Sequence, residues 1–306
     1  MLSQRLALVI LNLNGCDVLR DCLGSVLRSE PEAPHVIVVD NGSTDGSADM
    51  VRKEFPQVLL LATGQNLGFA GGNNVGLQVA IEAGFPYIVL LNNDTIVDPQ
   101  CFAHMVAAAE QDATVGAVTP LILFAEPADR IWCAGGSFNL WYGIARHYGL
   151  RRRRSSHQYQ RPRDVTFATG CAVLLRTQAL KEVGLLDESL FAYHEDAELS
   201  WRLLRAGWKI RYVPQAVLWH REGWSSRRSV GQAIRLRLCV RNILIVHRRY
   251  ARWYQRLTFW PCFFWRWVVL AGLNALLHRR FDTFRGIFSG IAAYFRGEIG
   301  KPKDIA

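Results

Sequence analysis

The sequence of 306 residues lacks the cysteine patterns that define a disulfide framework or a zinc site. Its seven cysteines are odd in number and scattered, and no pair has CxxC spacing. Disulfide-stapled domains and zinc-binding folds are therefore disfavoured, and a reducing compartment is expected. Half of the residues are hydrophobic, which also excludes a largely disordered chain.

A cleavable signal pattern is absent at the N-terminus, where MLSQR leads directly into an apolar run. A secretory signal would show a basic start, a longer apolar stretch and a small-residue cleavage site. We therefore expect a cytoplasmic protein.

Acidic residues are scarce in the last part of the chain. From residue 221 to the end there are 17 Lys and Arg against 4 Asp and Glu, whereas the preceding part has 19 basic and 22 acidic residues. The formal charge of +10 therefore belongs to the tail, and the rest is nearly neutral. This asymmetry disfavours a nucleic-acid-binding main domain and indicates that the tail has a partner of its own.

Short apolar runs that end in turn residues recur through the first half: RLALVILNLNG, HVIVVDNGS, QVLLLATGQN and YIVLLNND. Helical patterns such as DVLRDCLGSVLRS lie between them. This alternation predicts an α/β fold with a mostly parallel sheet covered on both faces. Ligands of such sheets bind beyond the carboxyl ends of the strands, where Asp40 and residues 92–94 stand.

The section from about residue 115 to 214 is less regular. RRRRSSHQYQRPR, residues 151–163, is interpreted as a mobile basic loop or as a solvated charge run without a partner. VTFATGCAVLLRTQAL predicts a strand leading into a short helix, and HEDAELSWRLLRAG predicts a helix that stops at Gly207.

Five motifs follow one another along the chain: VVDNGSTDGS, NLGFAGGNNVG, LLNNDTIVDP, TGCAVLLRTQALKEVGLLDESLFAYHEDAELSWRLLRAG and WHREG. In this order they resemble inverting glycosyltransferases of family 2, most closely bacterial rhamnosyltransferase-like members that build cell-surface polysaccharide. The resemblance covers about residues 5–225. It implies a GT-A fold, with a Rossmann-like sheet flanked by helices, for residues 1–225. The nucleotide-binding half would be about 1–114, the acceptor-side half about 115–225, and residues 226–306 a C-terminal helical region.

The resemblance implies a divalent metal, Mn²⁺ or Mg²⁺, held by Asp94 and His220. A hard cation would neutralise the charge that accumulates on a leaving diphosphate, and the imidazole mildly favours Mn²⁺. The family usually has an aspartate where this chain has Asn92, so modest metal affinity is expected. Asn-Asn-Asp is also good turn chemistry, and a His beside Trp219 is often only packed, so structural roles stay open.

The same resemblance implies that Asp40 accepts the imide N–H of uracil or thymine, although it could also cap the following helix. The glycines of NLGFAGGNNVG precede a predicted helix. Their backbone, free of side chains, would let a ligand approach closely, and the helix N-terminus favours anions. These glycines do not form GxGxxG after the first strand, which disfavours a dinucleotide-binding fold. The predicted nucleotide-binding residues are Asn12, Asp40, Asn66, Gly71, Gly72, Asn73, Asn92 and Asn93.

The motif YHEDAEL contains the predicted catalytic base. An acceptor hydroxyl must lose its proton as it attacks the anomeric carbon, and the resemblance assigns this step to Asp196 with Glu195 in support. Both open a predicted helix, whose dipole favours the ionised form. An ordinary acidic first turn is the alternative, and Glu198 with Arg202 has the spacing of a surface pair.

Gly170, Asp187 and Arg227 are predicted on the acceptor side, with a structural role for Asp187 as an alternative. Arg221 and Arg228 are further candidates for binding phosphates. No QxxRW motif follows the base helix. Because that motif marks processive synthases of the family, transfer of one sugar per encounter is expected.

The tail interleaves Arg with aromatic residues, and residues 257–277 approach the ~20 apolar residues of a membrane span. Pro261, Arg266 and Asn274 interrupt this stretch, and its Trp clusters and flanking Arg pairs suit the headgroup region. We therefore expect helices lying on the membrane; core or oligomer packing and a true span are the alternatives. Anionic lipid attracts each basic residue by ~1 kcal/mol. The expected location is peripheral, on the cytoplasmic face of the inner membrane.

These features predict a metal-dependent inverting glycosyltransferase. It would move one sugar, rhamnose-like among the candidates, from a UDP- or dTDP-sugar to a hydroxyl of a glycan or lipid-linked acceptor in cell-surface polysaccharide synthesis. A nucleotidyltransferase would need a basic Gly-rich loop where this chain has NLNGCD. Asp40, Asp94, Asp196 and His220 disfavour a non-catalytic scaffold binding membrane or nucleic acid. No nucleic-acid partner is expected, and the oligomeric state is not predicted.

Overall fold

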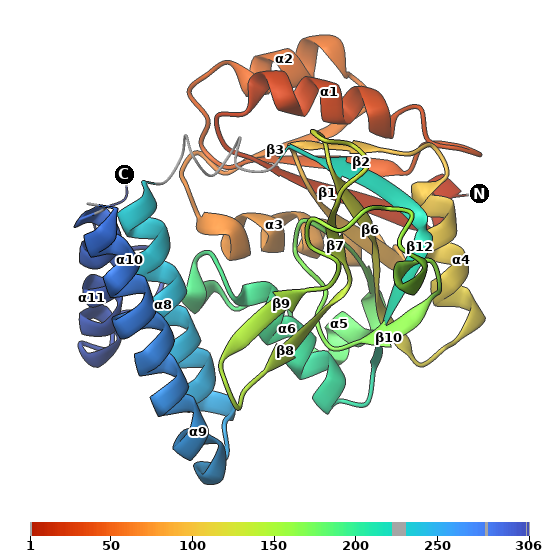
Figure 1. Cartoon of the computed structure of the whole chain (residues 1–306). Helices are drawn as coiled ribbons and strands as arrows, with labels where there is room; N and C mark the ends of the chain where they lie inside the picture. The colour runs from red at the N-terminus through yellow and green to blue at the C-terminus, as the bar shows by residue number, and fades with distance from the viewer. Residues whose placement is uncertain (1, 222–230, 279–280, 304, 306) are drawn as a thin grey trace.

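The computed structural model describes residues 2–221, 231–278, 281–303 and 305. Its centre is a large sheet in the order β10-β12-β6-β11-β4-β1-β2-β3, with β5 on β12 and β7 on β6 (Figure 1). The four strands of the first half, β1 (Leu6–Asn12), β2 (His35–Asp40), β3 (Leu59–Ala62) and β4 (Tyr87–Asn92), are parallel, as predicted. Their carboxyl ends therefore meet at one edge of the sheet.

The second half of the sheet is mixed. Its strands are β5 (Thr95–Val97), β6 (Val115–Phe124), β7 (Ile131–Ala134), β10 (Arg163–Val165), β11 (Ala172–Arg176) and β12 (Lys209–His220). β11 is antiparallel to both β4 and β6, whereas β12 is parallel to β6. The prediction of a mostly parallel sheet is thus correct only for the first half. A separate hairpin is formed by β8 (Gly136–Asn139) and β9 (Ile144–His147).

Helices cover both faces of the sheet. α1 (Cys16–Val26), α2 (Ser47–Glu54) and α4 (Cys101–Gln111) share one apolar core with alternate β1 residues, among them Leu8. α3 (Gly68–Glu82), α5 (Thr177–Val183) and α6 (Glu195–Arg205) share the other core with the intervening residues, among them Val9. This two-sided burial explains why the strands read as nearly continuous apolar runs. Single 3₁₀ turns occur at η1 (Leu2–Gln4), η2 (His157–Tyr159) and η3 (Glu188–Leu190).

The C-terminal helices form a layer beside η3 and α6 (Figure 1). They are α8 (Gln232–Tyr250), α9 (Trp253–Phe263), the π-helical segment η4 (Phe264–Leu270), α10 (Ala271–Leu277) and α11 (Phe281–Phe295). A third apolar core joins them to the rest of the chain, with Val240, Phe259 and Ile287 packed in the same cluster as Leu190 and Ala197. One side of this layer is therefore packed onto the α/β part, which was an alternative interpretation of the tail.

No helix within the described ranges is both long enough and apolar enough to cross a bilayer. Residues 257–277, for which a span was one alternative, instead lie in a helical run interrupted by the π-helical segment. Phe259 and Phe263 point into the third core, whereas Leu257 and Phe264 are exposed. The predicted boundary at residues 225–226 falls in the stretch 222–230, outside the described residues.

Candidate active site

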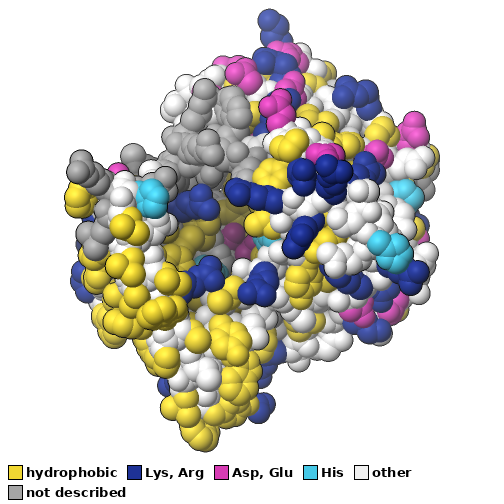
Figure 2. Space-filling view, in the orientation of Figure 1, with side chains coloured by type: hydrophobic (Ala, Val, Ile, Leu, Met, Phe, Trp, Pro, Cys, Tyr) yellow, Lys and Arg dark blue, Asp and Glu magenta, His cyan; other side chains and the backbone are white. Residues whose placement is uncertain are grey.

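A cleft of about 390 Å³ opens beyond the carboxyl ends of β1 and β4, bounded on its other side by the loop before α6. Figure 2 shows a hollow between the C-terminal layer and the α/β part, with Lys and Arg side chains at its rim. Seven residues predicted as site residues line the cleft: Asn66, Asn92, Asn93, Gly170, Glu195, Asp196 and His220. Residues far apart in sequence thus share one cavity.

Asp94 and His220 meet because β5 pairs with β12 and places Thr95 opposite His220. His220 Nε2 lies 3.2 Å from Asp94 Oδ1, and both side chains are buried. Burial alone would lower the pKa of His220, but Cys171 and Asp94 outweigh it and raise that pKa well above its usual value. The ring also packs edge-on against Trp132, with centroids 4.6 Å apart.

The donor set of this pair fits a divalent cation. Two ligand atoms bound at right angles, each about 2.2 Å from one ion, lie about 3.1 Å apart, close to the observed separation. His220 Nδ1 is buried without a hydrogen-bond partner in the described part of the chain. Within that part, no group of three His, Cys, Asp or Glu side chains is arranged to hold a metal. A cation held here would take two ligands from these side chains and its remaining ligands from other oxygen atoms.

Next to the cleft, polar side chains near the ends of β1, β2 and β4 are linked by hydrogen bonds. Asn93 Nδ2 donates to Asn12 Oδ1 at 2.6 Å, and Asn12 Nδ2 donates to Ser43 Oγ at 3.2 Å. Asp40 Oδ2 accepts from Ser43 N–H at 3.3 Å, so Asp40 closes a turn; it does not cap the following helix, because α2 begins at Ser47 after Gly46. The other oxygen of Asp40 is buried without a partner among the described residues and remains an available acceptor. Asp40 and Asn12 do not line the cleft directly.

Asn41, beside the predicted Asp40, carries a role that the sequence did not reveal. Its Nδ2 donates to Gly68 O and Asn66 Oδ1, and its Oδ1 accepts from Leu67 N–H. These bonds join the end of β2 to the turn that opens α3, where Gly68 has a φ of 77°. Asn41, Asn66 and Gly68 all line the cleft.

The other predicted residues of NLGFAGGNNVG serve packing. A Cβ on Gly72 would lie 2.4 Å from Leu11 Cδ1, and one on Gly71 would lie 3.1 Å from Leu67 Cβ. The close approach that these glycines permit is that of α3 to its neighbours. Asn73 Nδ2 donates to Phe69 O in its own helix, and none of the three residues lines the cleft. Asn74, which was not predicted, bonds Leu186 and Glu188 instead.

The two predicted catalytic carboxyls open α6 on the opposite wall. Asp196 Oδ2 accepts from Gly170 N–H at 3.0 Å and Oδ1 from Ala197 N–H at 2.8 Å. Burial raises the pKa of Asp196, and these two N–H groups offset part of the rise. Burial raises the pKa of Glu195 well above its usual value, and neighbouring Asp196 adds to the effect. Glu195 Oε2 is buried without a hydrogen-bond partner among the described residues.

Aromatic and thiol side chains complete the walls of the cleft, and sequence reasoning missed them. They are Phe69, Trp132, His147, Cys171, Phe191 and Tyr193. Burial and nearby His220 lower the pKa of His147 to about 4, so this imidazole is neutral at pH 7. Burial likewise raises the pKa of the Cys171 thiol, partly offset by His220. Trp132 and His147 come from short strands in the irregular section, where no motif pointed to them.

Four further predicted residues lie away from the cleft or outside the described residues. Asp187 accepts from Ser189 N–H at 3.0 Å and pairs with Arg249 of α8, which favours its structural alternative. Arg221 Nη1 lies 2.7 Å from Asp21 Oδ2. Arg227 and Arg228 fall in the stretch that the structure does not describe.

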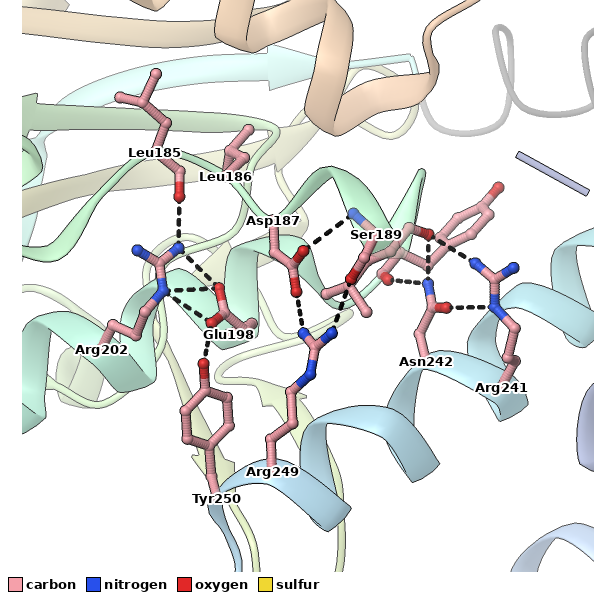
Figure 3. Close-up of polar contacts among 12 residues, drawn as sticks. Leu185, Leu186, Asp187, Ser189, Glu198, Arg202, Arg241, Asn242, Arg249 and Tyr250 are labelled. Atoms are coloured by element: carbon pink, nitrogen blue, oxygen red, sulfur yellow. Dashed lines mark hydrogen bonds and ion pairs between the residues drawn. The ribbon is translucent and has the colours of Figure 1, made fainter. Parts of the chain in front are cut away.

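Glu198 and Arg202 correct the expectation of a surface pair. Glu198 is 1% exposed, and both of its oxygens accept from Arg202 at 2.8 Å. Arg202 also donates to Leu185 O, and Tyr250 of α8 donates to Glu198 (Figure 3). The pair is thus an internal connection between α6, the chain before η3 and α8.

Comparison with known proteins agrees with this geometry. A sequence profile of the family described as "Glycosyltransferase like family 2" matches residues 4–242. N-acetylglucosaminyl-diphospho-decaprenol L-rhamnosyltransferase of Mycobacterium tuberculosis is 30% identical over 224 residues, which cover 67% of this chain and 72% of that protein. Poly-beta-1,6-N-acetyl-D-glucosamine synthase of Staphylococcus aureus is 28% identical over 210 residues, covering 67% of this chain and 47% of the synthase.

Two solved structures share the fold. GalNAc-T7 with UDP, GalNAc and Mn²⁺ superposes with a TM-score of 0.62 at 18% identity, over 83% of this chain and 49% of that one. Mannosyltransferase PcManGT from Pyrobaculum calidifontis, in complex with GDP-Man and Mn²⁺, gives a TM-score of 0.55 at 15% identity, over 96% and 88%. These likenesses confirm the predicted GT-A fold. Together with the profile match over most of its length, they establish that the chain is a glycosyltransferase of family 2.

Proposed function

We propose that the chain is a metal-dependent inverting glycosyltransferase that moves one sugar per encounter from a UDP- or dTDP-sugar, rhamnose-like among the candidates, to a hydroxyl of a lipid-linked glycan. The observation that carries this proposal is the shared cleft: His220, Glu195 and Asp196 line it, and Asp94 contacts His220. A cation-binding pair and a pair of carboxyls thus face one space large enough for a sugar diphosphate.

On the donor side, Asp94 and His220 would hold Mn²⁺ or Mg²⁺, which supplies charge neutralisation for the leaving diphosphate. The unpartnered oxygen of Asp40 supports imide recognition, because uracil and thymine present an N–H there. The relation to a rhamnosyltransferase favours a rhamnose-like donor. The neutral His147 and the aromatic walls would bind the sugar by hydrogen bonding and stacking.

On the acceptor side, Asp196 would remove the hydroxyl proton. Two adjacent buried carboxyls do not both ionise readily, so the charge resides on the one with better donors. Asp196 accepts two N–H groups, whereas Glu195 Oε2 has no partner in the described residues, so Asp196 would be ionised and Glu195 protonated. The proton passes to Asp196 as the acceptor oxygen bonds the anomeric carbon from the face opposite the breaking bond to the diphosphate.

A membrane surface is the proposed meeting place with the acceptor. The outer side of α9, η4, α10 and α11 exposes large apolar residues: Trp253, Leu257, Trp260, Phe264, Trp265, Leu273, Leu277 and Phe281, with exposed fractions of 42–79%. Figure 2 shows this apolar surface on the C-terminal layer. Arg252, Arg256 and Arg266 lie on the same run, and residues 232–277 contain no Asp or Glu. An apolar face with basic residues along α9 and η4 fits an anionic bilayer.

The test uses the purified chain with UDP and dTDP in the presence of Mn²⁺ or Mg²⁺. A thermal-shift panel should show stabilisation by about 2.7 kcal/mol at a hundredfold excess over the dissociation constant with metal, and less at the same nucleotide concentration without metal. Release of nucleotide from UDP-N-acetylglucosamine and dTDP-rhamnose would then identify the donor. Absence of any metal-dependent nucleotide binding would overturn the proposal.

A further inference from the structure

The loop between η3 and α6 is held in a backbone conformation that it would not adopt alone. Phe191, Tyr193 and His194 have φ values of 64°, 70° and 72°, and none of them is a glycine. Positive φ brings the Cβ of these residues close to the backbone, and Phe191, with a ψ of −62°, lies in the strained region of a γ-turn. Such strain persists only where surrounding contacts hold it. Phe191, Ala192 and Tyr193 line the cleft, and the loop leads directly into Glu195 and Asp196.

Hydrogen bonds to its carbonyls hold this loop. Asn242 Nδ2 lies 2.8 Å from Leu190 O, 2.8 Å from Ala192 O and 2.7 Å from Tyr193 O. Phe191 O accepts from Ala70 N–H of α3 at 3.1 Å, and His194 O accepts from Glu198 N–H at 2.9 Å. Each carbonyl from residue 190 to 194 therefore has a donor within reach, and the two N–H groups of one amide in α8 are shared among three of them.

Arg241 fixes the orientation of that amide (Figure 3). Its Nε donates to Asn242 Oδ1 at 2.9 Å, which directs the NH₂ group toward the loop. Its remaining guanidinium nitrogens donate to Leu190 O at 3.1 Å and to Gly300 O at 2.9 Å, near the C-terminus. Arg241 and Asn242 are 1% and 0% exposed. Burial lowers the pKa of Arg241 to about 10, so it remains charged at neutral pH.

We propose that Asn242, oriented by Arg241, is a positioning residue for the catalytic carboxyls; this inference rests on the proposed function. Without the amide, the carbonyls of Ala192 and Tyr193 would lose this donor, whereas Leu190 O would keep Arg241 and the N–H of Ala192, and the loop would gain by returning to negative φ. The first turn of α6 begins where the loop ends, so Glu195 and Asp196 would shift relative to the cleft. The C-terminal layer would then belong to the catalytic unit as well as carrying the membrane face.

The experiment compares Asn242→Ala and Asn242→Asp with the control Ile243→Ala on the same helix. Asp has nearly the shape of Asn but its carboxylate donates no N–H, whereas Ile243 packs in the third core. Three quantities are measured: the Kd of UDP and dTDP with Mn²⁺ by calorimetry, kcat for nucleotide release from the sugar donor, and hydrogen exchange of peptides covering residues 190–198.

For both Asn242 variants we expect kcat to fall about 100-fold, the order that an ångström-scale misplacement costs, with nucleotide Kd within twofold. Exchange should accelerate in residues 190–198 and stay unchanged in α1, which packs in the other core of the sheet. Ile243→Ala should lower Tm comparably but leave kcat of the folded enzyme within threefold. Should Asn242→Ala fail to fold, Asn242→Ser serves for the same comparison.

Wild-type kcat and wild-type exchange in the Asn242 variants would overturn the positioning role. A parallel fall of kcat and nucleotide binding, in proportion to the folded fraction, would overturn it as well. Failure of the proposed function would give a result distinct from failure of the positioning role, because the wild-type chain would then release no nucleotide from either donor. The exchange measurement reports on the loop in either case.

Discussion

The cleft and the outer face of the C-terminal layer depart from ordinary protein composition in opposite ways. In and beside the cleft, ionisable side chains are buried: Asp94 is 2%, Glu195 5% and His220 6% exposed. On the outer face, Trp253 is 73% and Leu277 79% exposed. Buried charge and exposed apolar surface both cost free energy unless a partner compensates. The partners proposed above differ accordingly: a charged nucleotide with its metal in the cleft, and an anionic bilayer on the outer face.

The strongest test of the cleft replaces the proposed base. Asp196→Asn keeps the side-chain volume but cannot accept the hydroxyl proton. We expect transfer to fall by at least about 10³-fold, within the range that general bases contribute, with nucleotide binding retained. Initial rates and calorimetry measure the two quantities. If Asp196→Asn transferred sugar within tenfold of the wild-type rate, Asp196 would be excluded as the catalytic base and Glu195 would become the candidate.

Replacing the cation-binding pair should produce a different signature. In Asp94→Ala, His220 keeps its place but loses the carboxylate beside it. We expect metal-dependent UDP or dTDP binding to weaken about 10–100-fold, the loss typical when metal coordination is disturbed, while binding without metal stays unchanged. Titration of nucleotide with and without Mn²⁺ separates the two. Equal weakening in both titrations would contradict a metal role.

The pH dependence of the free energy of unfolding tests whether Glu195 keeps its proton in the folded chain. The folded-state pKa of Glu195 is raised, so the folded chain keeps a proton that the unfolded chain loses above about pH 4.3. The free energy of unfolding should therefore decline with rising pH above that value, by up to about 1.4 kcal/mol per pH unit. Urea unfolding of Glu195→Gln between pH 5 and 8 should show a flatter decline. If the free energy of unfolding of Glu195→Gln declined with pH as steeply as that of the wild type, Glu195 would not be the source of the decline.

The outer face should tolerate substitution without loss of stability. Trp253, Leu257 and Trp265 are more than half exposed, so changing all three to Ser should alter the free energy of unfolding by less than about 0.5 kcal/mol per site. Co-sedimentation with anionic vesicles should fall at least tenfold. The matched control, Phe259→Ala on the inner side of α9, should cost about 3–5 kcal/mol. Failure of the wild-type chain to bind anionic vesicles would end the membrane proposal.

Residues at strand ends were predictable because strand periodicity is local. The ends of β2 and β4 follow from their apolar runs, so Asp40 and Asn92 could be placed beside one cleft before any coordinates. Even the meeting of Asp94 with His220 was expected, although only through the family resemblance. Its physical cause, the pairing of β5 with β12, joins segments more than 100 residues apart and has no local signal.

Contacts made between elements account for what was missed. Glu198 and Arg202 have the spacing of a surface pair, yet α8 covers them, which no helical pattern of α6 could reveal. Arg241 and Asn242 stand in the run VRNILIV, where two polar residues inside an apolar helix gave a signal that was not used. Gly71 and Gly72 were assigned to ligand approach because glycine spacing does not distinguish a ligand from a neighbouring side chain.

The size of the residue at position 68 limits how close the start of α3 can lie to the strained loop before α6. A single methyl group there would meet Phe191 O at 2.4 Å, so any larger residue would push the strained loop away from the start of α3. The closeness of this loop to α3 therefore depends on the absence of one carbon atom at position 68. Under the proposed function, a larger residue there would widen the gap between the nucleotide side and the carboxyl side of the cleft.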